Sequence, residues 1–159
     1  MHEPHDRLLA AALHGDAAAA KEALEAGASV DTRDTRDRTV LMIACERGDR
    51  AFAELLLSAG ASPNRRTTDS EETVMHQLAR QHNAEAASVL SLVLKHSPRI
   101  DRLDRFGWTP LMVASQVGAL ENVRALLASG ADPSLTAPDG RSAAMLASES
   151  GHLDVAGLL

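Results

Sequence analysis

The chain has 159 residues, of which 45% are hydrophobic and 2% aromatic, and its formal net charge at pH 7 is −6. This length corresponds to about one domain, and an apolar content made mostly of Ala and Leu favours close-packed helices over strands rich in Val, Ile and Tyr. The negative charge argues against nucleic acid or an anionic membrane surface as the main partner, because contacts with phosphate need a basic face.

The residues that bear on cellular location favour the cytoplasm. Charged residues or glycine interrupt every apolar run before it reaches the roughly 20 residues that span a bilayer. The opening residues, MHEPHDRLL, lack the basic and apolar regions of a secretory signal. The single cysteine, Cys45, has no second cysteine with which to form an internal disulfide. We expect a cytoplasmic protein.

Similar short segments recur along the chain. TVLMIA at 39–44 reappears as TVMHQL at 73–78, TPLMVA at 109–114 and SAAMLA at 142–147, with spacings of 34, 36 and 33 residues. Glycines follow at shared positions (48, 118 and 151), and the motif GASPN at 60–64 matches GASVD at 27–31 and GADPS at 130–134. The sequence therefore predicts one domain over 1–159, with five units at approximately 4–36, 37–70, 71–106, 107–139 and 140–159. The first and last units are atypical, and the last is incomplete.

Each unit predicts a helix, a tight turn, a second helix and a hairpin-like loop. The first helices begin after side chains that can accept a hydrogen bond from the free amides of the first turn, namely Thr39, Thr73, Thr109 and Ser142. Glycine closes the first helix at 48, 118 and 151 and the second helix at 27, 60 and 130. The second helices carry leucine pairs on one face, at 55 and 56, 126 and 127, and 158 and 159.

Such short helices predict a stacked architecture. A lone pair of helices of about eight and ten residues cannot bury its apolar face, so its stability must come from packing against neighbouring units. The sequence therefore predicts an all-α solenoid.

The repeated pattern resembles the ankyrin repeat. The pattern T-P-L-x-x-A, then G, then L-L and G-A-D, at a period of about 33 residues, covers essentially the whole chain and is strongest in the units that start at Thr39 and Thr109. Tetratricopeptide repeats have a similar period but lack these motifs. The resemblance implies stacked helix-turn-helix units with finger-like hairpin loops.

Several residues depart from the family pattern. The histidine that in this family usually follows the leucine, and hydrogen-bonds between neighbouring loops, is present only as His76. Methionine takes its place at 42, 112 and 145, where we expect thioether packing inside the core. The third unit has His82 where glycine is usual and Leu78 where alanine is usual, and it gains three residues between 83 and 97, so we expect a longer second helix there.

No catalytic constellation is present in the sequence. The seven histidines occupy non-equivalent positions, and no HExxH, CxxC, glycine-rich phosphate loop or GxSxG motif occurs. His2, His5 and Asp6 could gather a metal, but terminal histidines are mostly solvated. Cys45 lies on an inner helix face, where a thiol packs more often than it reacts. We expect no enzyme activity, no metal and no cofactor.

Arginine is concentrated in the predicted loops. The chain has 14 arginines and two lysines, and nine of the arginines fall in these loops. Aspartates are interleaved with them, so exposed salt bridges worth under about 1 kcal/mol explain part of the pattern. Arginine is nevertheless the cation that protein interfaces favour, so the bias also indicates a partner protein.

The aromatic residues indicate where a partner binds. The only tryptophan, Trp108, and Phe106 lie just before the predicted helix at Thr109. The ankyrin resemblance implies that such residues form the tips and inner sides of the fingers, which line a concave groove with the first helices. It places Leu103, Arg105, Phe106 and Trp108 on the recognition side of the fourth unit's finger, and the matching positions of the other fingers are Arg33, Arg36 and Arg38, Asp69 and Glu72, and Asp139 and Arg141. The alternative is that Trp108 folds back over the adjacent unit as a loop anchor, with Phe106 beside it.

These residues predict a non-catalytic module that binds another protein through its finger tips and concave face, because clustered aromatic and arginine side chains are typical of binding hot spots. We expect no nucleic acid, membrane or small-molecule substrate as partner, and a monomer when unbound. Two other classes stay open. The Ala- and Arg-rich composition suits a bacterial inhibitor or immunity protein for a toxin or enzyme, and the abrupt end at Leu159 suits an accessory domain of a larger enzyme or effector. An independent enzyme ranks last.

Overall fold

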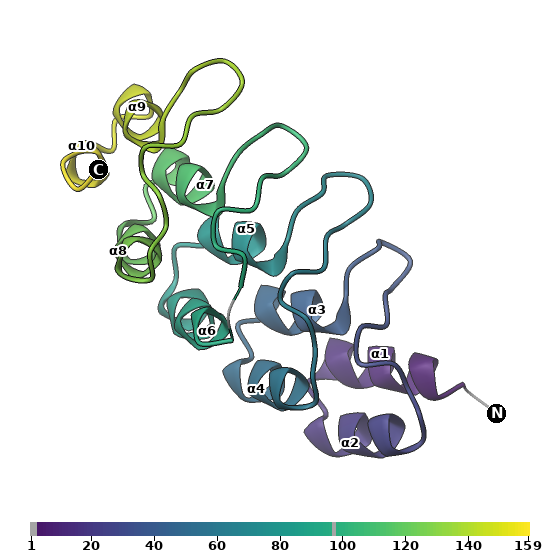
Figure 1. The fold of residues 1–159 in the computed structure, drawn as a ribbon. Coiled ribbons are helices and arrows are strands. Elements are labelled where there is room, and N and C mark those ends of the chain that lie inside the picture. Colours follow the sequence, from purple (N-terminus) through teal and green to yellow (C-terminus); the bar gives the residue numbers. More distant parts are fainter. Residues whose placement is uncertain (1–2, 97) are drawn as a thin grey trace.

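The computed structural model describes residues 3–96 and 98–159. Helices in this part of the chain form two rows, with the odd-numbered helices in one row and the even-numbered helices in the other (Figure 1). The helices are α1 (Pro4–His14), α2 (Ala17–Glu25), α3 (Val40–Glu46), α4 (Arg50–Ser58), α5 (Val74–Ala79), α6 (Ala84–Leu94), α7 (Pro110–Val117), α8 (Leu120–Ala128), α9 (Ala143–Glu149) and α10 (Leu153–Ala156). The long loops project from the odd-numbered row on one side. We call each of them a finger and name it after the helices that it joins.

The odd-numbered helices begin where the sequence predicts. Thr39, Thr109 and Ser142 each accept a hydrogen bond from the backbone amide three residues later, at 3.2, 3.2 and 3.3 Å. These bonds satisfy amides that the first helical turn leaves without a partner. Thr73 differs, because its own amide donates to the Nδ1 atom of His76 at 3.2 Å, and its hydroxyl lies 3.0 Å from the same nitrogen.

In four of the five units, glycine lies in the turn between the two helices, at 15, 48, 118 and 151. Gly118 ends α7 with a φ of 72°, a conformation that residues with a Cβ avoid. A Cβ at this position would also clash with Nδ1 of His152, because the imidazole of the next unit packs directly on Gly118. The predicted role of this glycine in the turn is therefore confirmed, and close packing of the next unit adds a second reason for it.

One continuous core runs through the stacked units. Each odd-numbered helix contacts the next odd-numbered helix, and α4, α6 and α8 contact one another in the same serial order. Fully buried leucines come from both rows, among them Leu41, Leu56, Leu90, Leu111 and Leu126. The described residues contain no β-strand beyond two isolated bridges, so the predicted all-α solenoid is confirmed.

Two predictions about apolar residues fail at the last unit. Leu158 and Leu159 were expected on the second helix, but α10 ends at Ala156 and Leu158 is exposed. Met145 was expected in the core with Met42 and Met112, yet 53% of its surface is exposed. Met42 and Met112 are buried because α5 and α9 follow their helices in the row, whereas no described helix follows α9 there.

The irregular third unit has a longer second helix, as expected. Helix α6 has 11 residues, compared with nine in both α4 and α8. The turn between α5 and α6, which lacks glycine, is hydrogen-bonded to the next unit. The buried Asn122 of α8 donates from its side-chain amide to the carbonyls of Leu78 at 3.0 Å and Gln81 at 2.6 Å.

Side-chain to backbone bonds also connect the loops at the base of successive fingers. The side-chain oxygens of Asp31, Asn64 and Asp101 accept from backbone amides of the next unit, at 3.0, 2.6 and 3.1 Å. These repeated bonds fix the spacing from one finger to the next. In the described part of the chain, no helix is long and apolar enough to cross a membrane.

Candidate partner-binding surface

Ion pairs between the end of a finger and the helix that follows it recur at matching positions. The residue just before the N-cap of an odd-numbered helix pairs with the residue eight positions later, near the end of that helix. This arrangement joins Arg38 to Glu46, Glu72 to Arg80, and Arg141 to Glu149. The same two positions of α7 hold Trp108 and Gln116, so no ion pair forms there. We call this set the ion-pair row, and α7 interrupts it.

The α2–α3 finger shows the complete arrangement. Asp34 accepts from the backbone amides of Arg36 and Arg38 through Oδ1, both at 2.9 Å, and from Nε and Nη2 of Arg38 through Oδ2, at 2.9 and 2.7 Å. Burial alone would raise the pKa of Asp34, but the hydrogen bonds from Arg38 and Arg36 outweigh it and hold that pKa below its ordinary value. The guanidinium of Arg38 thus lies between two carboxylates.

The α6–α7 finger keeps the turn but lacks the guanidinium. Oδ1 of Asp104 accepts from the amides of Phe106 and Trp108, at 2.8 and 2.9 Å. Asp104 is only 9% exposed, and its Oδ2 atom has no hydrogen-bond partner among residues 3–96 and 98–159. The sequence analysis missed Asp104, although its spacing to Trp108 repeats that of Asp34 to Arg38.

Trp108 combines the two roles that were weighed for it. Its ring is partly buried and packs against the core, as a loop anchor would. It also borders a pocket, and the guanidinium carbon of Arg141 lies 5.6 Å from the ring centroid. The Trp108 carbonyl accepts from the amide of Asp104 and from Nε2 of His76, both at 3.0 Å, so the backbone of this finger is fixed from two sides.

His76 has the inter-loop role that the ankyrin resemblance implies. Since Nδ1 accepts from Thr73, the neutral ring carries its proton on Nε2, which donates to Trp108. Burial lowers the pKa of His76, and the hydrogen bond to Trp108 and the charge of Asp104 only partly oppose this shift. The imidazole is therefore neutral near pH 7.

The tip of the α6–α7 finger is open. Phe106 is 67% exposed and Leu103 is also exposed. Arg105 stacks on Phe106, with its guanidinium carbon 5.9 Å from the ring centroid, and pairs with Asp69 of the neighbouring finger at 3.2 Å. A backbone bond from Arg105 to Ser70 at 3.0 Å also joins these fingers. The alternative in which Phe106 shelters beside the tryptophan does not fit this exposure.

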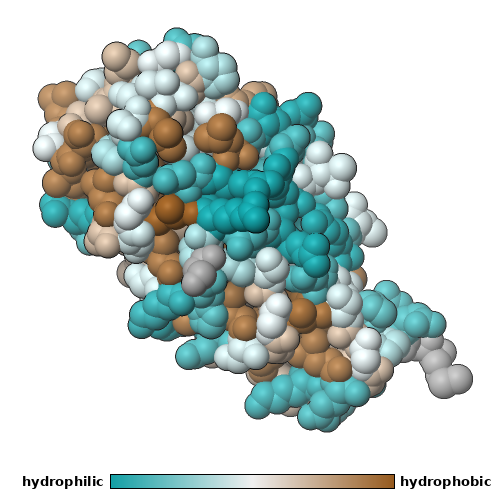
Figure 2. Space-filling view, in the orientation of Figure 1, coloured by the Kyte–Doolittle hydropathy of each residue, from teal (hydrophilic) through white to brown (hydrophobic). Residues whose placement is uncertain are grey.

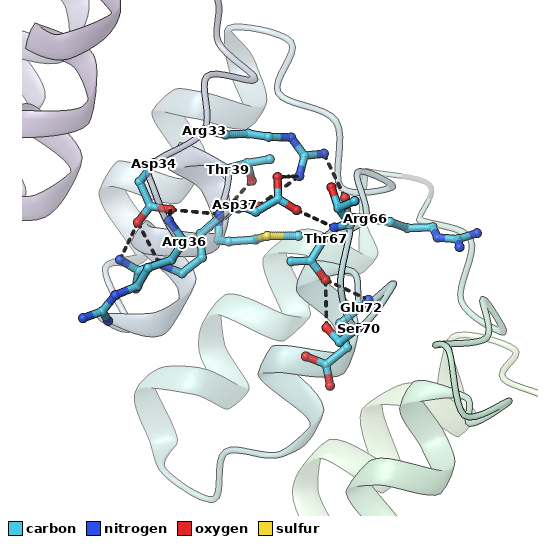
Figure 3. A network of polar contacts seen from close by, with 12 residues as sticks. Arg33, Asp34, Arg36, Asp37, Thr39, Arg66, Thr67, Ser70 and Glu72 are labelled. Atoms are coloured by element: carbon cyan, nitrogen blue, oxygen red, sulfur yellow. Dashed lines mark hydrogen bonds and ion pairs between the residues drawn. The ribbon is translucent and has the colours of Figure 1, made fainter.

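The arginines of the α2–α3 finger mostly bind within the chain (Figure 3). Arg33 donates to Asp37 at 2.8 Å and to the carbonyl of Arg66 at 2.8 Å. Asp37 adopts a φ of 63° and also accepts from the amide of Thr68, so it joins two fingers. Arg36 is exposed, and among the described residues its side chain has no hydrogen bond or ion pair. Partner binding by Arg33 and Arg38 would have to compete with these internal bonds.

The interruption of the ion-pair row coincides with a pocket of about 420 Å³. The pocket is lined by Glu72, Arg80, Asp104, Phe106, Trp108, Val113, Gln116, Val117, Asp139 and Arg141. It brings together five of the predicted site residues: Glu72, Phe106, Trp108, Asp139 and Arg141. The other predicted residues lie outside its lining: Arg33, Arg36, Arg38, Asp69, Leu103 and Arg105. The sequence analysis missed Arg80, Val113, Gln116 and Val117.

Hydrophilic side chains gather across the middle of the face shown in Figure 2, and hydrophobic patches lie toward both ends. Among residues 3–96 and 98–159, no group of three His, Cys, Asp or Glu side chains is placed to hold a metal ion. His2, which was considered as a ligand, lies outside the described residues. Cys45 is buried, and burial raises the pKa of its thiol far above the usual value.

A comparison with known families matches nearly the whole chain to one family. A family model described as ankyrin repeats in three copies matches residues 4–67, 65–137 and 94–159. Calmodulin-binding transcription activator 4 of Arabidopsis thaliana is 41% identical over 73 residues, which are 42% of this chain and 7% of that protein. Ankyrin repeat protein nuc-2 of Neurospora crassa is 33% identical over 85 residues, which are 53% of this chain and 8% of that protein.

The human DNA-binding protein RFXANK is 41% identical over 76 residues, which are 48% of this chain and 28% of that protein. The matched part is thus less than a third of each of these relatives. The family model, in contrast, covers nearly all of this chain. The serial stacking of the helices and the His76 bond between fingers agree with that match. The chain therefore belongs to the ankyrin repeat family.

Proposed function

We propose that this chain is a non-catalytic module that binds another protein through its finger tips and concave face, with the α6–α7 finger at the centre. Ankyrin repeats are generally protein–protein interaction modules, and the family is typically non-catalytic. The observation that carries the proposal is the interruption of the ion-pair row at α7, where Trp108 and Gln116 border a pocket beside the exposed Phe106.

The rigid backbone around this pocket supports the proposal. Asp104 and His76 hold the finger in place through bonds to Trp108, so little ordering remains to be done when a partner binds. Central aromatic residues on such a preorganised surface are typical of hot spots, where truncation costs about 2 kcal/mol or more.

The relatives favour an accessory module of a larger protein as a more specific form of this function. Each of them is several times longer than its matched part. Some are named for DNA binding or transcription activation. For this chain a protein partner is favoured over direct contact with DNA, because its net charge is −6 and acidic side chains lie on its fingers.

The proposal is tested by capturing the partner from the native organism and measuring its affinity for variants. Phe106→Ala is expected to weaken binding at least tenfold, because an exposed aromatic anchor is lost without disturbing the core. Leu13→Ala is the matched control, since Leu13 is also exposed but lies on α1. Equal affinity of both variants and the unaltered chain, with folding intact, would reject this centre.

A further inference from the structure

The pocket at α7 differs from the matching place at α3 at two positions, because Trp108 replaces Arg38 and Gln116 replaces Glu46. At α3, Arg38 fills the space between Asp34 and Glu46, and the side chains of Arg38 and Asp34 are only 19% and 13% exposed. At α7 the matching positions are Trp108, Asp104 and Gln116. The carboxylate of the turn is thus kept, while the cation that neutralises it is absent.

The charges around the pocket leave this carboxylate without a cation. Three carboxylates line the pocket, from Glu72, Asp104 and Asp139, and two guanidiniums, from Arg80 and Arg141. Arg80 pairs with Glu72, and Arg141 pairs with Asp139 at 2.7 Å. In the described part of the chain, only Asp104 among the three carboxylates has no ion pair. The Asp104 side chain is largely buried, but its Oδ2 atom still reaches solvent, so a cation from outside can approach this carboxylate.

The walls of the pocket suit the rest of a long basic side chain. Phe106 and Trp108 present aromatic surface, on which planar guanidinium groups stack. Val113 and Val117 supply apolar surface for a methylene stem. Gln116 adds an amide oxygen where Glu46 has a carboxylate in the α3 unit. These features together match an arginine side chain better than a purely apolar one.

We infer that this pocket takes an arginine side chain of the partner protein, and this inference rests on the proposed function. The incoming guanidinium occupies the place that Arg38 has beside Asp34, and it donates to Oδ2 of Asp104. Lysine fits less well, because a single ammonium cannot reproduce the two donors that Arg38 directs at one carboxylate oxygen. The three carboxylates and two guanidiniums of the lining, together with the net charge of −6 on the whole chain, favour a basic partner segment over an acidic one.

Trp108 allows a direct test, because it is the only tryptophan and it lines the pocket. The probes are four five-residue peptides with an acetylated N-terminus and an amidated C-terminus. Each has Arg, Lys, Leu or Glu at the central position and glycine at the other four. Each peptide is titrated to about 20 mM against indole fluorescence in 0.15 M salt, since one side chain supplies only millimolar affinity. We expect the Arg peptide to bind about fivefold or more tightly than the Lys and Leu peptides and the Glu peptide to bind least.

The Asp104→Asn variant tests the role of the carboxylate. Asn keeps an oxygen that can accept from the finger amides, but it removes the charge. We expect the preference for Arg over Leu to disappear in this variant and to persist in Glu54→Gln, which loses one charge on α4 away from the pocket. NMR spectra of the backbone amides of both variants establish that the fold is kept.

Three results would overturn the inference. They are equal or tighter binding of the Leu peptide, an Arg preference that survives in Asp104→Asn, and no fluorescence change with any peptide. Each leaves the proposed function standing if Phe106→Ala still weakens capture of the partner. The proposed function itself would fail by a different result, namely that the Phe106→Ala variant captures the partner as fully as the unaltered chain.

Discussion

The Nε2–H group of His76 donates to the carbonyl of Trp108 at 3.0 Å, so the third unit holds the finger of the fourth. The equivalent positions of α3 and α7 have Met42 and Met112, whose thioethers pack instead of bonding to the next finger. The one polar bond of this kind in the described residues therefore supports the finger that borders the pocket.

The first prediction concerns pH and His76. Burial places the folded-state pKa of His76 below its ordinary value of 6.5, so the unfolded chain takes up the proton at higher pH than the folded chain. The stability due to neutral His76 is present above about pH 6.5 and is lost as the pH falls below it. His76→Met, which copies the neighbouring units, is expected to lose this dependence. Urea unfolding at pH 7.5 and 5.5 measures the unfolding free energy of both chains. An equal change in this free energy between the two pH values in both chains would contradict the prediction.

The second prediction concerns Asp37, which adopts a φ of 63° and joins two fingers. Asp37→Gly removes the bonds to Arg33 and Thr68 but relieves the backbone, whereas Asp37→Ala removes the bonds and keeps the strain. We expect Ala to cost about 2 kcal/mol of unfolding free energy and Gly about 1 kcal/mol less. Chemical denaturation of the three chains gives these values. If Ala were as stable as Gly, the strain would be negligible.

Asn122 carries the third prediction. Its amide donates to the carbonyl of Leu78, in the last turn of α5, and to that of Gln81, in the turn that follows α5. Asn122→Ala leaves two acceptors without this donor and is expected to cost about 1–3 kcal/mol. Asn122→Asp is expected to cost more, because a carboxylate would face two carbonyl oxygens. Thermal unfolding compares these variants with Glu121→Ala, a control at an exposed position. If Asn122→Asp were more stable than Asn122→Ala, the Asn122 amide would not be the donor to these carbonyls.

The fourth prediction compares two methionines at matching positions. Met112 is 1% exposed and Met145 is 53% exposed. Met112→Ala is expected to destabilise the fold by about 2–5 kcal/mol, because it opens a cavity in the core. Met145→Ala is expected to change stability by about 0.5 kcal/mol or less. Urea midpoints separate the two cases, and similar losses would mean that Met145 is covered in solution.

Much of the fold could be predicted because the same local signals, helix caps and helix-ending glycines, recur in successive units. Thr39, Thr109 and Ser142 cap helices, and Gly118 ends one, for reasons that a single unit already contains. The exposure of Met145 could not be predicted in this way, because it depends on what packs after α9 and not on its own unit.

The candidate site was predicted only in part. Phe106 and Trp108 were found because aromatic residues are rare in this chain. Asp104 and Gln116 were missed because their role becomes visible only by comparison with Asp34 and Glu46, the matching residues of another unit. A signal was available in the eight-residue spacing of Arg38 to Glu46, Glu72 to Arg80 and Arg141 to Glu149. The positive φ of Asp37 could not be predicted in this way, since aspartate also occurs in the other fingers without a positive φ, as at Asp104 and Asp139.

The four-residue helix α10 gives the fifth unit little second-layer support, yet that unit supplies Asp139 and Arg141 to one wall of the pocket. Local opening of this unit and occupancy of the pocket are therefore thermodynamically linked. A bound ligand is expected to slow hydrogen exchange at amides of α9 and α10 that it does not touch.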